Sequence, residues 1–290
     1  RSPRSSISPY SRHPAGKTFA SCMVDKDGID RDVTDNDAEY MVSIARSTGR
    51  AVGRLHFAAP VTHVYNPLDY AFEAHRTYLE RFCGRQSEIV LLGMNPGPWG
   101  MVQTGVPFGE VTVVRGWLGI DSGVTPPRLQ HPKRPIEGFQ CSRSEVSGQR
   151  LWGWARDRFK TPNRFFQRFF VWNYCPLSFM EESGRNRTPD KLPAAERVPL
   201  FEVCDEALRK IVDVIQPAYV LGVGKFSEQR ARAALDDRTK IGSILHPSPA
   251  SPAANPRSCT RNQEDSRPII GVRAAPEAAP IRATAKTAPV

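Results

Sequence analysis

The sequence predicts an α/β fold, a single domain with a central four-stranded parallel sheet flanked by helices. Four short apolar runs occur along the middle of the chain, helical patterns separate them, and a turn rich in Gly, Pro or polar residues follows each run. Strands buried on both faces of a parallel sheet are apolar throughout, and the connections between them are usually helices. The predicted strands are Glu88–Leu92, Phe169–Trp172, Ala218–Val223 and Ile241–Leu245.

Helices are predicted where apolar residues recur every three or four positions. The first helix begins near Asn36, and an extended or looped segment, residues 55–67, follows it. A second helix spans Asp69–Cys83. Its core-facing side carries Tyr70, Ala74, Tyr78 and Phe82. The clearest helix has a continuous apolar stripe from Leu200 to Ile215 and lies between the second and third predicted strands.

The two ends of the chain differ from its middle in composition. We expect residues 1–35 to form a disordered basic tail, residues 36–255 the folded domain, and residues 256–290 a disordered Pro/Ala/Arg-rich tail. Residues 1–17 are rich in Arg and Ser and contain no acid, which fits a nuclear address, an organellar transit peptide or a simple solvated tail. Prolines disfavour the helix of a transit peptide, so a nuclear location is our expectation.

The charge balance favours a polyanionic partner. Forty Lys and Arg against thirty Asp and Glu give a formal net charge of +10, and each basic side chain on a phosphate releases condensed counterions. Nucleic acid is therefore favoured over an acidic membrane surface. The six cysteines form no CxxC pair, so we expect neither a metal nor a cofactor. No apolar run is long enough to span a membrane, which predicts a soluble protein.

Ligands of open α/β sheets bind outside the carboxyl ends of the strands, so the turns after the four runs form the candidate site. The first turn, GMNPGPWG, holds Asn95 between glycines and prolines that restrict the backbone. An Asn in such a turn is often only a local cap. The continuation GVPFGEV places Phe108 directly before a predicted helix, where its ring could stack on a planar base.

Two further polar residues follow strands at the same edge. Asn173 ends the second strand, where it either caps a turn or recognises a ligand. A single carboxamide satisfies the acceptor and donor of a uracil edge together and refuses cytosine. His246 follows the fourth strand in HPSPASPAAN. A lone His is usually structural, but here its N–H could stabilise the negative charge that builds on O2 of a departing uracil.

Longer segments around these residues resemble the single-strand-selective monofunctional uracil-DNA glycosylases, within the uracil-DNA glycosylase superfamily. The signature segments are GMNPGPWGMVQTGVPFGEV, VWNYCPL and LHPSPASPAAN. The similarity also includes HFAAPVTHVYNPLDYAFEAHRTYL, HPKRP, EVSGQRLWGW, SGRNRTP and GVGKFSEQRARAAL. It runs from about Leu55 to Asn255 and implies a uracil-DNA glycosylase-like fold.

The resemblance also implies a role for each site residue. Asn95 would position the hydrolytic water, and His246 would stabilise the uracil anion. Phe108 would stack on the flipped base, and Asn173 would recognise its edge. The pocket would be shaped by Met94, Gly97 and Met101. In this family a gap near the first motif admits substituents at C5, so the implied substrates are uracil and 5-hydroxymethyluracil, with thymine excluded.

The resemblance places the loop after His246 in the space that the flipped base leaves. Predicted DNA contacts come from this loop and from one basic turn: Ser248, Pro249, Ala250, Ser251 and Arg185. Family members commonly have Arg where this chain has Ala250, so we expect the loop to plug the duplex less well and to support single-strand activity better than duplex activity. They also continue with Gly-Trp and a closing helix, whereas this chain has PRSCTRNQ. Lys133 and Arg134 either touch phosphates or form a solvated loop.

We therefore expect a monomeric base-excision-repair glycosylase that flips uracil out of single- or double-stranded DNA and leaves an abasic site. Water is the expected nucleophile, because the motif loops offer no activated amine apart from Lys225, which begins a helix. One alternative is a nucleotide-binding protein that uses GVGKF, although this segment lacks the Walker spacing. The other is a catalytically impaired DNA-binding module derived from a glycosylase, which the altered C-terminus makes plausible.

Overall fold

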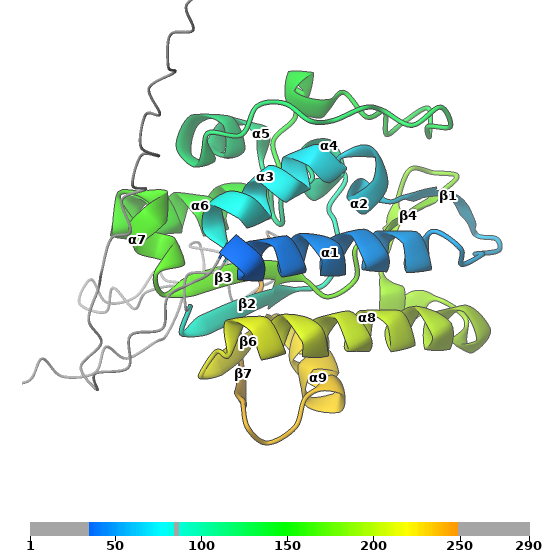
Figure 1. The fold of residues 1–290 in the computed structure, drawn as a ribbon. Coiled ribbons are helices and arrows are strands. Elements are labelled where there is room, and N and C mark those ends of the chain that lie inside the picture. The colour runs from blue at the N-terminus through cyan, green and yellow to red at the C-terminus, as the bar shows by residue number, and fades with distance from the viewer. Residues whose placement is uncertain (1–34, 84–86, 249–290) are drawn as a thin grey trace, which may run out of the picture. The chain divides into compact units, whose positions relative to one another are not determined.

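A computed structural model describes residues 35–83 and 87–248 (Figure 1). The two predicted tails, residues 1–35 and 256–290, lie outside this part of the chain apart from Asp35, and so does the end of the predicted domain. The domain limits therefore stay predictions. The first described helix, α1 (Asp35–Val52), begins within one residue of the predicted start.

The central sheet has four parallel strands in the order β3-β2-β6-β7, which confirms the predicted fold class. The strands are β2 (Ile89–Gly93), β3 (Phe169–Asn173), β6 (Tyr219–Val223) and β7 (Lys240–Ile244). The register pairs Gly93 with Asn173 and Val223 with Ile244, so the carboxyl ends of the strands meet at one edge. Every residue of β2 and β3 is buried, which explains why both runs are apolar throughout.

Helices flank this sheet (Figure 1). The long helix α8 (Ala194–Ile215) carries the predicted apolar stripe and lies beside α1, and α9 (Lys225–Ala234) packs on β6 and β7. The helix predicted over Asp69–Cys83 is wrong in its continuity. The structure forms α2 (Pro67–Tyr70) and α3 (Phe72–Phe82) instead. The Tyr70 carbonyl accepts a hydrogen bond from the Thr125 N–H at 2.8 Å, so a distant loop uses a carbonyl that a continuous helix would need.

A second, antiparallel sheet was not predicted. Its strands, in the order β1-β4-β5, are β1 (Val61–Tyr65), β4 (Ser178–Glu181) and β5 (Asn186–Arg187). β1 lies within the segment predicted to be extended or looped. The remaining elements are α4 (Met101–Thr104), α5 (Val111–Val113), the π-helical η1 (Val114–Leu118), the 3-10 helices η2 (Gly138–Gln140) and η3 (Pro189–Lys191), α6 (Val146–Phe159) and α7 (Pro162–Phe166).

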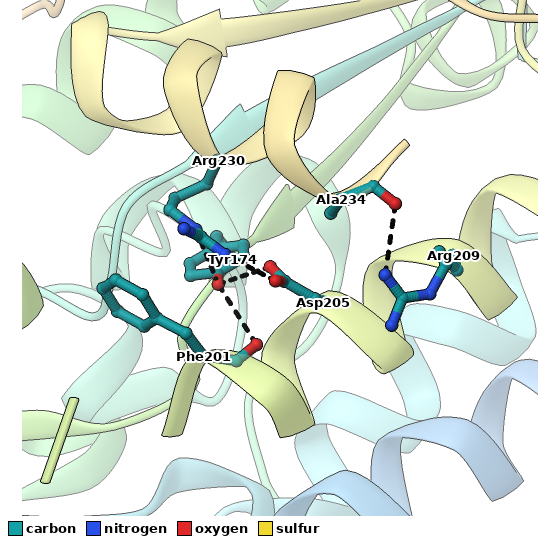
Figure 2. A network of polar contacts seen from close by, with 6 residues as sticks. All are labelled: Tyr174, Phe201, Asp205, Arg209, Arg230 and Ala234. Atoms are coloured by element: carbon teal, nitrogen blue, oxygen red, sulfur yellow. Dashed lines mark hydrogen bonds and ion pairs between the residues drawn. The ribbon is translucent and has the colours of Figure 1, made fainter. Parts of the chain in front are cut away.

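A polar network anchors the chain directly after β3. The Tyr174 hydroxyl donates to Asp205 Oδ1 on α8 at 2.6 Å and accepts from Arg230 Nε on α9 at 2.9 Å, and Arg230 also pairs with Asp205 (Figure 2). Burial and the bond to Asp205 raise the pKa of Tyr174 well above its ordinary value, so the hydroxyl keeps the proton it donates. The residue next to Asn173 is thus fixed to two helices.

Candidate active site

A pocket of about 370 Å³ opens at the carboxyl edge of the central sheet. Its walls come from the turn after β2, the segment before α5, the start of α6, the end of β3, the β5 region and the turn after β7. The structure brings eight predicted site residues together in these walls: Met94, Asn95, Gly97, Met101, Phe108, Asn173, His246 and Ser248. Their roles stay predictions, but the amide of the first turn and the imidazole of the last share one cavity.

Asn95 is held by the residue directly before β4. Its Nδ2 donates to the Leu177 carbonyl at 3.2 Å, so the carboxamide oxygen is the atom suited to accept a hydrogen bond from a water molecule. The neighbouring Pro96 carbonyl accepts from Asn186 Nδ2 at 3.1 Å and from Ser178 Oγ at 3.0 Å. The strands β4 and β5 of the short antiparallel sheet therefore hold the first turn in place.

Phe108 and Asn173 pack tightly over Gly93, the last residue of β2. A Cβ atom on Gly93 would lie 2.1 Å from Asn173 Oδ1 and 2.6 Å from Phe108 Cε2, so any side chain there would displace both groups. Phe108 also has a φ of 54°, a left-handed conformation that costs energy in a residue other than glycine. Strain of this kind concentrates where the surrounding structure imposes a functional orientation.

Asn173 is buried, with a relative exposure of 5%. Its Nδ2 lies 3.2 Å from the sulfur of Met101, and its Oδ1 lies on the Gly93 side. The donor and the acceptor of the amide therefore have fixed and distinct neighbours. A thioether sulfur is a weak acceptor, so a stronger acceptor on a ligand can compete for this N–H.

The turn after β7 defines which ring nitrogen of His246 carries the proton. The Ser248 N–H donates to His246 Nδ1 at 3.1 Å, so the neutral ring bears its hydrogen on Nε2. Burial lowers the pKa of His246, which favours this neutral form. The ring lies 6.3 Å from that of Phe108, centroid to centroid. Arg150 Nη1 on α6 donates to the Pro247 carbonyl at 3.0 Å and ties the turn to that helix.

Four polar pocket residues were not predicted: Glu145, Ser147, Asn186 and Thr188. Glu145 precedes α6 in the N-cap position but makes no side-chain cap. Its carboxylate instead lies where a side chain on Gly97 would be, 2.4 Å from an ideal Cβ. Burial raises the pKa of Glu145, and a hydrogen bond from the Trp99 backbone partly offsets this. In the sequence these residues lie within EVSG and GRNRTP, and no local pattern separates them from ordinary polar residues.

Other predicted residues lie away from the pocket or outside the described residues. Arg185 is exposed in the turn between β4 and β5 and does not line the pocket. Pro249, Ala250 and Ser251 belong to the part of the chain that the structure does not describe. Lys225 begins α9 and is not a pocket residue.

Residues 35–83 and 87–248 contain no group of three or more His, Cys, Asp or Glu side chains that could hold a metal ion. In the same part of the chain, no helix combines the length and the apolar character that a bilayer crossing requires. The cysteines described there are all buried: Cys83, Cys141, Cys175 and Cys204.

Comparison with known proteins identifies the family. Residues 80–266 match the model of the uracil DNA glycosylase superfamily. The single-strand selective monofunctional uracil-DNA glycosylase of Rattus norvegicus is 52% identical over 207 residues, which cover 70% of this chain and 74% of that protein. The Mus musculus protein of the same description is 51% identical with the same coverage.

The fold also resembles a solved structure. The crystal structure of wild-type Pedobacter heparinus SMUG2 superposes with a TM-score of 0.52 at 19% identity, covering 71% of this chain and 87% of that one. This likeness supports the fold alone. The family match and the two relatives lead to one conclusion: the chain belongs to the uracil-DNA glycosylase superfamily and, within it, to the single-strand selective monofunctional uracil-DNA glycosylases.

Proposed function

We propose that this chain is a base-excision-repair glycosylase that excises uracil and 5-hydroxymethyluracil from DNA by hydrolysis. The observation that carries the proposal is the convergence of four side chains on one pocket: Asn95, Phe108, Asn173 and His246. Family membership supplies uracil as the base, and the four side chains supply stacking, edge recognition, charge stabilisation and water positioning.

Base recognition depends on Phe108 and Asn173. The aromatic ring stacks on the flipped pyrimidine, which is worth about 1–3 kcal/mol per base. The Asn173 carboxamide accepts from N3–H through Oδ1 and donates to O4 through Nδ2. Cytosine has an acceptor at N3 and a donor at C4, so it would leave both amide groups of Asn173 mispaired inside a buried site.

Bond cleavage depends on His246. The bond between N1 and C1′ breaks with its electron pair moving to the base, and negative charge builds on O2. The Nε2–H of the neutral imidazole donates to this oxygen, in the manner of an oxyanion hole. The Ser248 N–H keeps the opposite nitrogen unprotonated, so the ring needs no rearrangement during the reaction.

The nucleophile is a water molecule that Asn95 orients. No lysine is among the described residues that line the pocket, so the pocket wall offers no amine for a Schiff base with the sugar. Water adds its oxygen to C1′ and gives up one proton, and the uracil anion takes up one proton, which leaves an abasic site and free uracil. A carboxamide is a poor base, so stabilisation of the leaving group provides most of the acceleration.

Uracil is flipped more easily from single-stranded or mispaired DNA. Unstacking a base costs a few kcal/mol in a matched duplex and less in a single strand or at a mismatch. We therefore propose that single strands are cleaved faster than duplexes. The relatives described as single-strand selective support this ranking. The monomeric state, the nuclear location and the DNA contacts of Arg185 and residues 248–251 stay predictions.

The proposal is tested with purified full-length chain and three oligonucleotides, carrying uracil in single-stranded DNA, uracil opposite guanine, and unmodified cytosine. Alkaline cleavage after incubation reveals abasic sites. We expect product from both uracil substrates, most rapidly from the single strand, and none from cytosine. DNA binding without any product would favour the impaired binding module instead.

A further inference from the structure

Trp99 is a residue at the rim of the pocket for which the reaction described above has no use. It is half-buried and lies between Pro98 and Gly100, which both line the pocket. Two arginines lie over its ring: the guanidinium carbon of Arg134 is 5.1 Å from the ring centroid, and that of Arg143 is 4.6 Å from it. An indole ring attracts guanidinium groups, so Trp99 holds both cations at the rim.

The two arginines have no acidic partner within residues 35–83 and 87–248, because neither forms an ion pair there. Arg134 Nη1 donates to the Lys133 carbonyl at 2.8 Å. Its Nε is buried and has no acceptor among the same residues. Two positive charges beside one ring also repel each other. An anion at the rim would supply acceptors and relieve this repulsion.

Positive charge continues from the arginine pair to the turn between β4 and β5. An ideal Cβ on Gly184 in that turn would lie 3.2 Å from Lys133 Cβ and 3.4 Å from Arg134 Cζ, so the two segments pack together. Lys133 and the next residue of the turn, Arg185, are both exposed. Neither forms an ion pair in the described part of the chain.

A second hollow, of about 410 Å³, includes Arg143 in its wall. Its only acid among the described residues, Glu110, accepts a hydrogen bond from the Val113 N–H at 3.0 Å and so caps α5. The other polar side chains of the wall are neutral or positive: Thr112, Arg115, Gln140, Ser142 and Arg143. The surface beside the arginine pair therefore has room and hydrogen-bond donors for a sugar and a phosphate.

We propose that Arg134 and Arg143, held on Trp99, form a phosphate clamp for the DNA strand on one flank of the flipped nucleotide. This inference rests on the proposed function and adds a subsite to it. A strand whose base enters the pocket must pass the rim, and a guanidinium binds phosphate oxygens with two parallel hydrogen bonds. Such contacts fix the position of the strand without reading its sequence. They matter most in single-stranded DNA, where no second strand adds contacts.

The first experiment measures binding, which requires no base release. The full-length variants are Arg134→Gln, Arg143→Gln and the double variant, and the ligand is a single-stranded oligonucleotide without uracil. Arg158→Gln is the matched control, because Arg158 is exposed in the last turn of α6 and forms no ion pair among the described residues. Fluorescence anisotropy over a salt series gives Kd and its salt dependence.

We expect each clamp variant to raise Kd about 3- to 10-fold. The slope of log K against log salt should become less steep by about 0.7 for each lost phosphate contact. Arg158→Gln should keep both values near those of the wild-type chain. A double variant with wild-type Kd and slope would overturn the proposal. Wild-type chain that binds DNA but releases no uracil would refute the proposed function and leave this binding test valid.

The second experiment locates the clamp on the strand. Two uracil oligonucleotides each end one nucleotide beyond the uracil, one on the 5′ side and one on the 3′ side. In the wild-type chain, removal of the clamped flank should raise KM, whereas the double variant should show no such penalty. Its kcat should stay within about twofold of the wild-type value, because the arginines contribute binding alone. A persistent penalty, or a large fall in kcat at unchanged KM, would refute the clamp and leave uracil excision intact.

Discussion

The turn after β2 and the turn after β7 each bring one side chain to the pocket, but different means hold them. Asn95 and Pro96 bond to a separate sheet, through Leu177, Ser178 and Asn186. The last turn receives a bond within itself, from Ser248 to His246, and a bond from the long side chain of Arg150. The first turn is therefore held by side-chain hydrogen bonds to two paired strands and the residue before them, and the last by a helix side chain and its own geometry.

This difference suggests that the two turns fail in different ways. Loss of a clamp on the first turn removes a hydrogen bond from a buried backbone group and lowers stability. Loss of the Arg150 bond on the last turn leaves a looser imidazole and lowers the rate.

Removing either of the two proposed catalytic side chains should have the largest effect. We expect His246→Ala to lower kcat for uracil release about 10²- to 10³-fold, and Asn95→Ala about 10²-fold or more. DNA affinity should stay close to that of the wild-type chain. The double variant should lose less than the product of the two single losses, because both groups act in one transition state. Single-turnover cleavage and fluorescence anisotropy measure the two quantities, and wild-type rates in either single variant would refute its assignment.

Gly93→Ala tests the wall that both turns share. The added methyl group would collide with Asn173 Oδ1 and the Phe108 ring, so kcat/KM should fall by about 10²-fold, as for a misplacement of about 1 Å. Gly153→Ala is the matched control. Nothing lies within 4 Å of its Cβ position, and alanine should stabilise α6 by up to about 1 kcal/mol. Similar activities in the two variants would contradict the packing argument.

Asn186→Ala removes the clamp on the first turn. The Pro96 carbonyl and the Phe179 N–H would both lose a bond to this side chain, so we expect the free energy of unfolding to fall by about 1–3 kcal/mol. Urea denaturation measures this loss. A large fall in kcat at unchanged stability would show that the first turn behaves like the last.

Arg150→Met removes the helix bond to the last turn and keeps most of the aliphatic stem. The Pro247 carbonyl loses its charged donor, and we expect kcat to fall up to about tenfold, with a smaller change in stability than in Asn186→Ala. Thermal melting and kcat are measured on the same preparation. The comparison between the turns would be wrong if the melting temperature fell more than in Asn186→Ala.

Acidification should affect the last turn. Because burial lowers the pKa of His246 below 6.5, the unfolded chain binds this proton first as the pH falls, and the contribution of His246 to stability declines below pH 6.5. Protonation also converts Nδ1 from the acceptor of the Ser248 N–H into a donor. We expect an acid limb in the uracil rate below that pH, absent from His246→Gln. An unchanged limb in the variant would assign it to another group.

Much of the site was predictable because its signals are local. Apolar runs identify strands by their composition, and Gly/Pro-rich turns after those runs identify the sheet edge. Asn95, Phe108, Asn173 and His246 all lie in such turns or at their borders, and similarity to a known family then gave each a role. The apolar runs also located the strands β2, β3, β6 and β7, because each predicted end lies within one residue of the observed one.

Tertiary structure decided the features that depend on partners distant in the chain. The antiparallel sheet pairs β1 with β4 across more than a hundred residues. The alternation of apolar and polar residues in strands this short does not predict such a pairing. The break at Ala71 depends on a loop that takes the Tyr70 carbonyl. Glu145 was also hidden in the sequence, because an acid before a helix normally caps it. Its side chain points into the pocket because Gly97, which has no side chain, leaves space there. The direction of a side chain depends on such space, which other segments of the chain provide.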